Sequence, residues 1–544
     1  SFIASGSGSW AQGQSVPEHY WKEEREELRE LAKINEIELS VHNPANAPPL
    51  SGFSQNGFSP EVKQESLKEL KRTIEFAADV ARGGPITVHT QEFSRPIFEA
   101  DLKLGKLKGY EEEEKKSPLY YVDQRTGQLK GYNRQAEIPT PKTDNEGNVL
   151  RNQDGTVKEW NIKKIYDIEQ EAIKKGNVPV EEVVKFIKSK ELEFEKGQAD
   201  ETLIRAKKLE DEYNFINNVT EKIKEDSKKN FDYAKYQAMT QVENFEKGIK
   251  ERLTPHEGTP EYKNYLENPI KYLEKIRDRF KNESKAAFEI ADSRQIGVLQ
   301  HQDEIKNSVS MEKYALTQTA DTVAEAAIFA YRKEKAMKLE KPLVIAPENV
   351  FAQTYGSHPA ELKKIIEESR NAMKTKLLKD GLVKNEEEAS KIAAERIRAT
   401  FDIGHVNTWR QYFKGSPEEF NKYILNEVSK LNKEGLIGHV HINDNFGYED
   451  VHITPGQGNA PIKEFVDKIT KEGFKGKMVI EAGNQRGGEG WHVLPGAWQT
   501  LNSPIYRINS IYDTWTDIKG SYFGKTGSPN YLVGDLAPSK EWTL

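Results

Sequence analysis

The sequence predicts an α/β fold, namely a (β/α)8 barrel interrupted by one large, mainly helical insertion. Short apolar segments alternate with amphipathic helical segments before residue 93 and again after residue 308. The short segments are apolar on both faces, which is typical of parallel strands covered by helices. The chain has 544 residues, whereas one barrel needs about 250, so an insertion fits the length as well as the pattern.

The N-terminal part of the barrel is expected in residues 1–92, with strands and helices in alternation. Strands are predicted at Phe2–Ser5, Glu38–Val41 and Ile86–Val88, and helices at His19–Ile34 and from Pro60 onward. Ser59 is a good N-cap and Pro60 suits the first helical position, which marks the start of the second helix.

The C-terminal part of the barrel is expected in residues 309–503. Helices are predicted at Met311–Lys338, Pro359–Ala399, Pro417–Lys433 and Pro461–Lys471, and strands at Leu343–Ala346, Thr400–Asp402, Ile437–Ile442 and Met478–Ile480. Ser416 and Glu419 form a capping-box pattern at the start of one of these helices. The two parts supply seven strands, and a closed barrel needs eight. A first strand upstream of Ser1 is therefore expected.

Residues 93–308 are expected to form an inserted subdomain of hairpins followed by helices. Turn signals stand at Thr126-Gly127, Glu146-Gly147 and Asp154-Gly155. Ile162–Gln300 is rich in Lys and Glu and predicts antiparallel helical arms, which are a candidate surface for partner contacts. Residues 504–544 form an aromatic and Gly-rich tail, expected to wrap the surface.

The composition restricts the chemistry. The chain contains no cysteine, so a metal site must use His, Asp and Glu. The net charge of −7 gives no global basic surface for nucleic acid. No apolar stretch is long enough to span a membrane, and a cytoplasmic protein is expected.

Polar side chains able to bind a metal follow six consecutive predicted strands. They are His42, His89, Glu348, Asp402 with His405, His441, and Glu481, and Asp450 and His452 follow in the loop after His441. One such residue is usually structural, but this set includes five of the 11 histidines. All would lie at the C-terminal face of the barrel, where active sites form. The donor types suit Zn²⁺, Mn²⁺ or Mg²⁺.

These segments resemble the xylose isomerase-like TIM-barrel superfamily, which includes sugar isomerases and epimerases and also endonuclease IV. The matching segments are Val41-His42-Asn43-Pro44, Val88-His89, Glu348-Asn349, Asp402–His405, His441-Ile442-Asn443-Asp444, Asp450-Val451-His452 and Glu481. For the isomerases the resemblance implies one Mn²⁺ or Mg²⁺ ion on Glu348, Asp402, His441 and Glu481. For endonuclease IV it implies three zinc ions, with His42, His89, His405, Asp450 and His452 as further ligands.

Two catalytic hypotheses follow, each with Glu348 and Glu481 as catalytic residues and with Trp10, Asn349 and Asn443 as substrate-binding residues. The first is zinc-dependent cleavage of phosphodiester bonds at abasic sites in DNA, which the full ligand set favours. The second is isomerisation or epimerisation of a small sugar or sugar phosphate. The acidic charge favours it, as do the loop after His42, which has no aromatic residue before Pro48, and the loop Gly6–Ser15, which has no Lys or Arg. A third hypothesis is a non-catalytic scaffold on the same barrel.

Overall fold

The computed structural model describes residues 2–3, 17, 20–104, 107, 111–142, 144, 150, 152, 158–250, 252–481 and 493–501. The chain forms two compact units. The barrel unit comprises Ser1–Ala136 and Val309–Leu544, and the arm unit is Glu137–Ser308. The expected tail 504–544 and the predicted substrate residue Trp10 lie outside the described residues.

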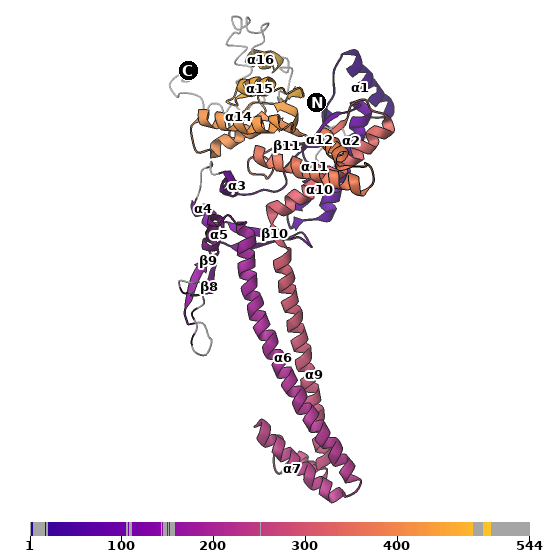
Figure 1. Cartoon of the computed structure of the whole chain (residues 1–544), viewed down its shortest axis with the longest axis vertical. Helices are drawn as coiled ribbons and strands as arrows, with labels where there is room; N and C mark the ends of the chain where they lie inside the picture. The colour runs from indigo at the N-terminus through magenta and orange to yellow at the C-terminus, as the bar shows by residue number, and fades with distance from the viewer. Residues whose placement is uncertain are drawn as a thin grey trace, which may run out of the picture. The chain divides into compact units, whose positions relative to one another are not determined.

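The barrel unit is built on a parallel sheet of seven strands in the described part of the chain (Figure 1). In spatial order they are β1 (Phe2–Ile3), β2 (Val41–His42), β5 (Gly84–His89), β11 (Leu343–Glu348), β12 (Ala399–Asp402), β13 (Ile437–Ile442) and β14 (Lys477–Ile480). Spatial order follows chain order, as in a singly wound barrel. The predicted α/β barrel fold is confirmed, whereas the strand expected before Ser1 falls outside this sequence.

Helices between the strands supply the covering layer of the barrel unit. The main ones are α1 (Lys22–Ile34), α2 (Pro60–Val80), α10 (Met311–Met337), α11 (Pro359–Lys379), α12 (Glu386–Arg396), α14 (Pro417–Lys433), α15 (Ile462–Lys471) and α16 (Val493–Thr500). Leu70 and Ile74 of α2 and Ile345 of β11 are fully buried in one continuous apolar core. Both predicted caps are confirmed: Ser59 accepts from Glu61 N and Val62 N, and Ser416 and Glu419 form a capping box.

The predicted helical stretch Pro359–Ala399 is divided into the two helices α11 and α12, and its last residue already belongs to β12. The chain turns at Gly381, whose φ of +65° is easily adopted only by glycine. Asn385 then caps α12, its side chain accepting from Glu388 N at 2.8 Å. The backbone extends from Ile397, and β12 begins at Ala399.

The expected boundary of the insertion at Phe93 needs correction, since residues 93–136 lie within the barrel unit. A second sheet, in the order β10-β6-β7-β4-β3, joins this stretch to the barrel loops. Its strands are β3 (Phe53–Ser54), β4 (Gly57–Phe58), β6 (Pro118–Asp123), β7 (Gln128–Asn133) and β10 (Ser308–Ser310). The predicted hairpin at Thr126-Gly127 is confirmed, and Gly57 of β4 pairs with Gln128.

The arm unit is mainly helical, as predicted. It contains the hairpin β8 (Glu137–Pro141) and β9 (Trp160–Lys164), followed by α5 (Ile165–Lys174), α6 (Pro179–Ser227), α7 (Phe231–Ile249), α8 (Pro260–Glu267) and α9 (Pro269–Asn307). α6 and α9, of 49 and 39 residues, lie side by side (Figure 1). The turn signals at Glu146-Gly147 and Asp154-Gly155 lie outside the described residues.

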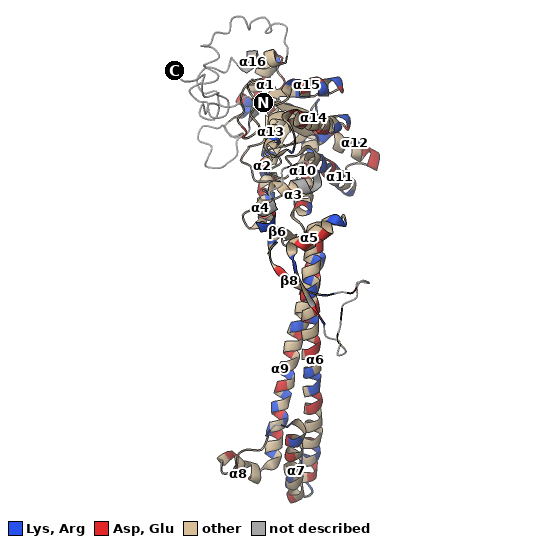
Figure 2. Cartoon of the chain, turned by 90° about the vertical axis from the view of Figure 1, so that its left-hand side faces the viewer, with Lys and Arg blue, Asp and Glu red and all other residues tan. Residues whose placement is uncertain are grey.

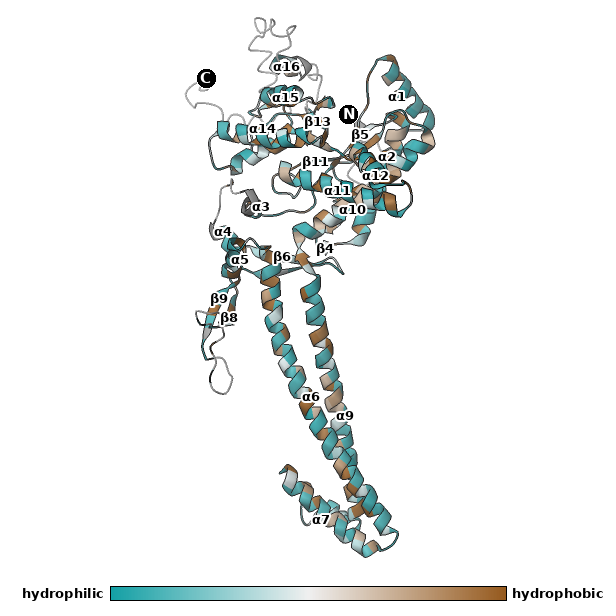
Figure 3. Cartoon of the chain, in the orientation of Figure 1, coloured by the Kyte–Doolittle hydropathy of each residue, from teal (hydrophilic) through white to brown (hydrophobic). Residues whose placement is uncertain are grey.

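The long helices of the arm pair through a narrow apolar stripe. Ala206 and Ile216 of α6 and Ala291 and Val298 of α9 are buried. Acidic and basic residues are interspersed along both helices (Figure 2), and most of both ribbons is coloured as hydrophilic (Figure 3). No helix among the described residues is long and apolar enough to cross a membrane.

Candidate metal centre

The register of the parallel sheet brings the predicted ligands to one level of the barrel. Glu348 is paired with His89 across β11 and β5, and Asp402 is paired with His441 across β12 and β13. The C-terminal ends of parallel strands lie on the same face of a barrel. The side chains of these strand ends therefore point toward a common site.

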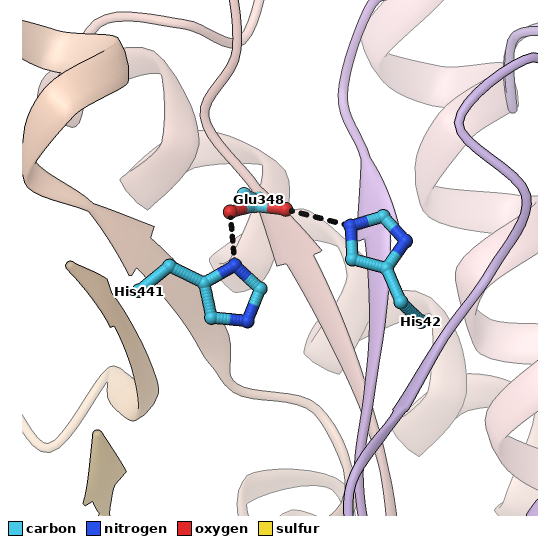
Figure 4. Close-up of side chains that lie close together, drawn as sticks. All are labelled: His42, Glu348 and His441. Atoms are coloured by element: carbon cyan, nitrogen blue, oxygen red, sulfur yellow. Dashed lines mark ion pairs between the residues drawn. The ribbon is translucent and has the colours of Figure 1, made fainter. Parts of the chain in front are cut away.

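A central group of ligands surrounds the buried carboxylate of Glu348. His441 Nδ1 lies 2.7 Å from Glu348 Oε1, and His42 Nε2 lies 3.3 Å from Oε2 (Figure 4). His89 Nε2 is 3.6 Å from the same Oε2. Glu481 Oε1 lies 3.1 Å from His441 Nδ1. Each oxygen of Glu348 thus faces a histidine from a different part of the barrel.

The central group fits a divalent cation. Both carboxylate oxygens of Glu348 and both ring nitrogens of His441 are buried without a hydrogen-bond partner in the described structure. The short contact between them lacks hydrogen-bond geometry. A buried carboxylate without donors is strongly unfavourable unless a cation neutralises it. Carboxylate and imidazole donors of this kind are the ligands of zinc and manganese sites.

A second, outer group is formed by His405, Asp450 and His452. His405 Nε2 lies 3.2 Å from Asp450 Oδ2, and His452 Nε2 lies 3.1 Å from Asp450 Oδ1. The two Nε2 atoms are 3.3 Å from each other. Three donor atoms therefore converge on one small volume.

Backbone carbonyls orient the two outer histidines. His405 Nδ1 lies 2.8 Å from Asn349 O, and His452 Nδ1 lies 2.8 Å from Glu481 O. A carbonyl oxygen only accepts, so each Nδ1 carries the proton and donates it to the carbonyl. In each ring Nε2 is therefore the nitrogen that faces Asp450, and once deprotonated it is the atom that could bind an ion. This tautomer is the one that a metal-bound histidine needs.

The nine predicted ligands thus lie together, in overlapping groups. Within the described residues three sets have donor atoms all within 4.8 Å of one another: His42, Glu348 and His441; Glu348, Asp402, His441 and Glu481; and His405, Asp450 and His452. His89 joins the first set through its contact with Glu348. The roles of these residues as ligands, and of Glu348 and Glu481 in catalysis, stay predictions.

Asn349 and Asn443, expected to bind substrate, both hold Asp402. Asn349 donates to Asp402 O at 2.9 Å and accepts from Asp402 N at 3.0 Å. Asn443 Nδ2 donates to Asp402 Oδ2 at 2.5 Å. Both amides are fully buried. Their position explains how Asp402 is oriented, and the predicted contact with substrate stays a prediction.

The electrostatics of the centre reflect an excess of carboxylates. Burial acts to raise the pKa of Glu348, but His441 and His42 hold that pKa well below its ordinary value. Burial acts to lower the pKa of His441, but Glu348 and Glu481 raise it to about 10. Burial raises the pKa of Asp402 to about 6. The site therefore attracts positive charge, either as protons on histidine or as metal ions.

Two buried carboxylates that the sequence did not single out tie the ligand loops together. Asp444 accepts hydrogen bonds from the backbone N–H groups of Asn445, Gly456, Gly458 and Ala460, at 2.8 to 3.0 Å. It thereby closes the loop that carries Asp450 and His452. Glu92, three residues after His89, accepts from Ser51 N at 2.7 Å and joins the loops after β2 and β5.

His439 is a third residue that the sequence reading missed. It lies two residues before His441 on β13, so both rings point to the same side of the strand. The ring centroids are 5.0 Å apart, and His439 is fully buried. Burial lowers the pKa of His439 to about 3, so it is neutral in the barrel interior. Two histidines separated by one residue in a predicted strand could have indicated from the sequence that His439 shares a face with His441.

Parts of the chain are similar to known proteins. Residues 386–498 match the family model of the xylose isomerase-like TIM barrel. An uncharacterized protein of Methanocaldococcus jannaschii, MJ1311, is 40% identical over 96 residues, which are 18% of this chain and 29% of that protein. A solved structure of a D-tagatose 3-epimerase-like protein aligns with 93% of this chain and 89% of its own, with 13% identity and a TM-score of 0.35.

The family match covers β12, β13 and β14 and the loops that follow them. These segments carry six of the nine predicted ligands, namely Asp402, His405, His441, Asp450, His452 and Glu481. The superfamily contains isomerases, epimerases and endonuclease IV-like enzymes and commonly binds divalent metals. Residues 386–498, which contain β12, β13 and β14, are therefore similar to the xylose isomerase-like TIM barrel.

Proposed function

We propose that this chain is a metal-dependent hydrolase of phosphodiester bonds, of the endonuclease IV type, which binds up to three divalent ions, zinc first. Its proposed substrate is DNA that contains an abasic site. The observation that carries the proposal is the outer group of His405, Asp450 and His452 beside the central group. A reaction that uses one ion on the central group gives no reason for a second set of converging donors.

The arrangement suits a phosphate ester. Zinc ions in such a site would neutralise charge on the phosphate and lower the pKa of a water molecule to about 7. Glu348 remains a carboxylate at neutral pH, because His441 and His42 hold its pKa low despite burial. One oxygen of Glu348 faces His441 and the other faces His42, so this carboxylate fixes the positions of the two histidines relative to each other.

Glu481 is the carboxylate proposed to handle a proton. It lies at the edge of the central group, and its side chain is partly exposed, whereas that of Glu348 is not. The backbone carbonyl of Glu481 also orients His452. This residue therefore links the central and outer groups, and a proton that it accepts has a path to solvent.

The test combines metal counting with cleavage of abasic DNA by the wild type and by the double variant His89→Ala with His452→Ala. Three zinc ions per chain and cleavage are expected for the wild type. The double variant removes His89, which contacts Glu348 of the central group, and His452 of the outer group. The set of four ligands Glu348, Asp402, His441 and Glu481 stays intact. The variant is expected to lose metal ions and to cleave abasic DNA several orders of magnitude more slowly than the wild type. His256→Ala, an exposed histidine of the arm unit, is the matched control.

A wild type that binds one ion and leaves abasic DNA intact would overturn the proposal in favour of a sugar reaction. A wild type that binds three ions and cuts no phosphodiester would refute the proposed hydrolysis but not the trinuclear site. In that case deletion of residues 137–308 would test whether the arm unit restricts access.

The second candidate is a divalent-metal isomerase or epimerase of a small sugar or sugar phosphate. The loops that follow β2, β11 and β13, residues 43–59, 349–358 and 443–461, contain no Lys or Arg. DNA-binding proteins obtain much of their affinity from such residues at phosphates. With one Mn²⁺ or Mg²⁺ on the central group, Glu348 and Glu481 would flank a sugar and exchange a proton between neighbouring carbons.

A further inference from the structure

Two aromatic side chains are exposed in loops that contact or carry the outer group of ligands. Phe351 follows β11 in the same loop as Asn349, and 41% of it is exposed. Its ring centroid lies 6.4 Å from that of His405. Tyr448 stands two residues before Asp450 and is 62% exposed. The two come from different loops: the ring of Phe351 lies beside His405, and Tyr448 belongs to the loop that carries Asp450.

The exposure of Phe351 is imposed by a well-packed loop. Its neighbours Val350 and Ala352 are fully buried, so the loop turns one large side chain outward. Phe351 O accepts hydrogen bonds from Thr354 N at 2.9 Å and from Thr354 Oγ1 at 2.8 Å. Single exposed apolar side chains are common, so what distinguishes Phe351 is its position beside His405 in a constrained loop.

Tyr448 is held in a similar way. Gln411 Nε2 donates to Tyr448 O at 3.1 Å, and Gly447 N donates to Asn445 Oδ1 at 2.9 Å. Gly447 has a φ of +83°, and a Cβ there would lie 3.0 Å from Arg410 Cδ. The backbone before Tyr448 is thus constrained, while its ring faces solvent.

The charges around these rings point to what they bind. The loops of both residues, 349–358 and 443–461, have no Lys or Arg. Neither loop therefore offers a cationic side chain of its own to a ligand. Arg410, which lies against Gly447, is hydrogen-bonded to Asn421 and to Asn459 O. Aromatic rings beside a phosphate-binding metal group suit a flat, largely apolar ring that belongs to the same substrate. Nucleobases stack on aromatic side chains irrespective of sequence.

We infer that Phe351 and Tyr448 form a stacking subsite for a nucleobase next to the reacting phosphate. The inference rests on the proposed function and specifies how the protein would select its substrate. Recognition comes from ring stacking at the outer group, and metal ions alone engage the phosphate. Because few side-chain cations take part, the binding of DNA to this subsite depends only weakly on salt concentration.

The experiment uses the metal-loaded full chain and a duplex with 2-aminopurine beside an abasic site. Stacking on an aromatic side chain quenches the fluorescence of 2-aminopurine. Phe351→Ala and Tyr448→Ala are each expected to abolish most of the quenching and to raise KM by roughly 10- to 100-fold, the effect of one lost stacking contact. The metal content and kcat are expected to stay unchanged, and Phe351→Trp is expected to retain both quenching and KM.

Tyr120→Ala is the matched control, because Tyr120 of β6 is 40% exposed and follows no ligand strand. Cleavage with quenching and KM independent of both Phe351 and Tyr448 would overturn the subsite and leave the proposed function intact. Quenching that depends on Phe351 without any cleavage by the wild type would refute the hydrolysis and support the subsite. Neither quenching nor cleavage by the wild type would refute both.

Discussion

The central and outer ligand groups are built in different ways. The central group stands on strand ends: His42, His441 and Glu348 are the last or nearly the last residues of β2, β13 and β11, and all three are buried. In the outer group, Asp450 and His452 come from a loop, and both are partly exposed. The sheet register therefore determines the central group, whereas loop structure determines the outer one.

Each group depends on its own buried carboxylate that is not a predicted ligand. Asp444 accepts four backbone hydrogen bonds and holds the loop of the outer group. Glu92 joins the loops after His42 and His89 through one backbone donor, Ser51 N. Outer-shell contacts of this kind commonly set metal affinity by 10- to 100-fold. Because Asp444 holds only the loop of the outer group, its substitution is expected to weaken metal binding at the outer group and not at the central group.

The largest effect is expected from Glu348→Gln, because this one carboxylate faces His42, His89 and His441. The variant is expected to lose the central ions and to lower the cleavage rate on the order of 10⁴-fold. Elemental analysis and the rate of abasic DNA cleavage measure the two effects. Glu368→Gln, at an exposed position of α11, is the control. Retention of all ions by Glu348→Gln would contradict a bridging role.

Removal of an outer ligand tests whether the two groups are separate. His405→Ala is expected to lower the metal content from three ions to two and the rate by about 10²- to 10³-fold, since one charge-neutralising ion is lost. The central histidines keep their contacts with Glu348. If this variant lost every ion, the two groups would have to be regarded as one cooperative site.

A smaller effect is expected from Asp444→Asn, which keeps the shape of the side chain but replaces one acceptor oxygen by a donor. The loop of Asp450 and His452 loses part of its backbone support. We expect about 10- to 100-fold weaker zinc binding at the outer group alone. Titration against a competing chelator measures this affinity, with the exposed Asp467→Asn as control. Equal weakening at the central group would contradict the division.

The smallest effect concerns stability and pH. Burial raises the pKa of Glu92 from 4.5 to about 7, against hydrogen bonds from Thr319 and Ser51 that act to lower it. The unfolded chain therefore releases this proton at lower pH than the folded chain. Stability associated with Glu92 is complete below pH 4.5 and decreases as the pH rises to about 7, by at most roughly 3 kcal/mol.

Glu92→Gln is expected to remove this dependence, because the amide cannot ionise. The loss of melting temperature between pH 5 and pH 8 should be smaller in the variant than in the wild type. Thermal unfolding of the metal-free protein at both values measures the difference. An identical pH dependence in the two proteins would show that Glu92 keeps an ordinary pKa in the fold.

The sequence by itself determined the fold class and the positions of the predicted ligands. Strand boundaries and side-chain types are local properties, and the C-terminal ends of parallel strands share one face. The grouping of His42 with Glu348 and of Asp402 with His441 therefore followed from the order of the strands. The mainly helical nature of Ile162–Gln300 followed equally from local composition.

Only the tertiary structure decided how the ligands divide and what holds them. The carbonyl that orients His405 belongs to Asn349, and the donors to Asp444 come from a loop that folds back on it. The boundary between the units lies after Ala136 and not at Phe93, and β6 and β7 share a sheet with β3 and β4 of the barrel unit. Such hydrogen bonds join residues far apart in the chain, and no local pattern specifies their partners.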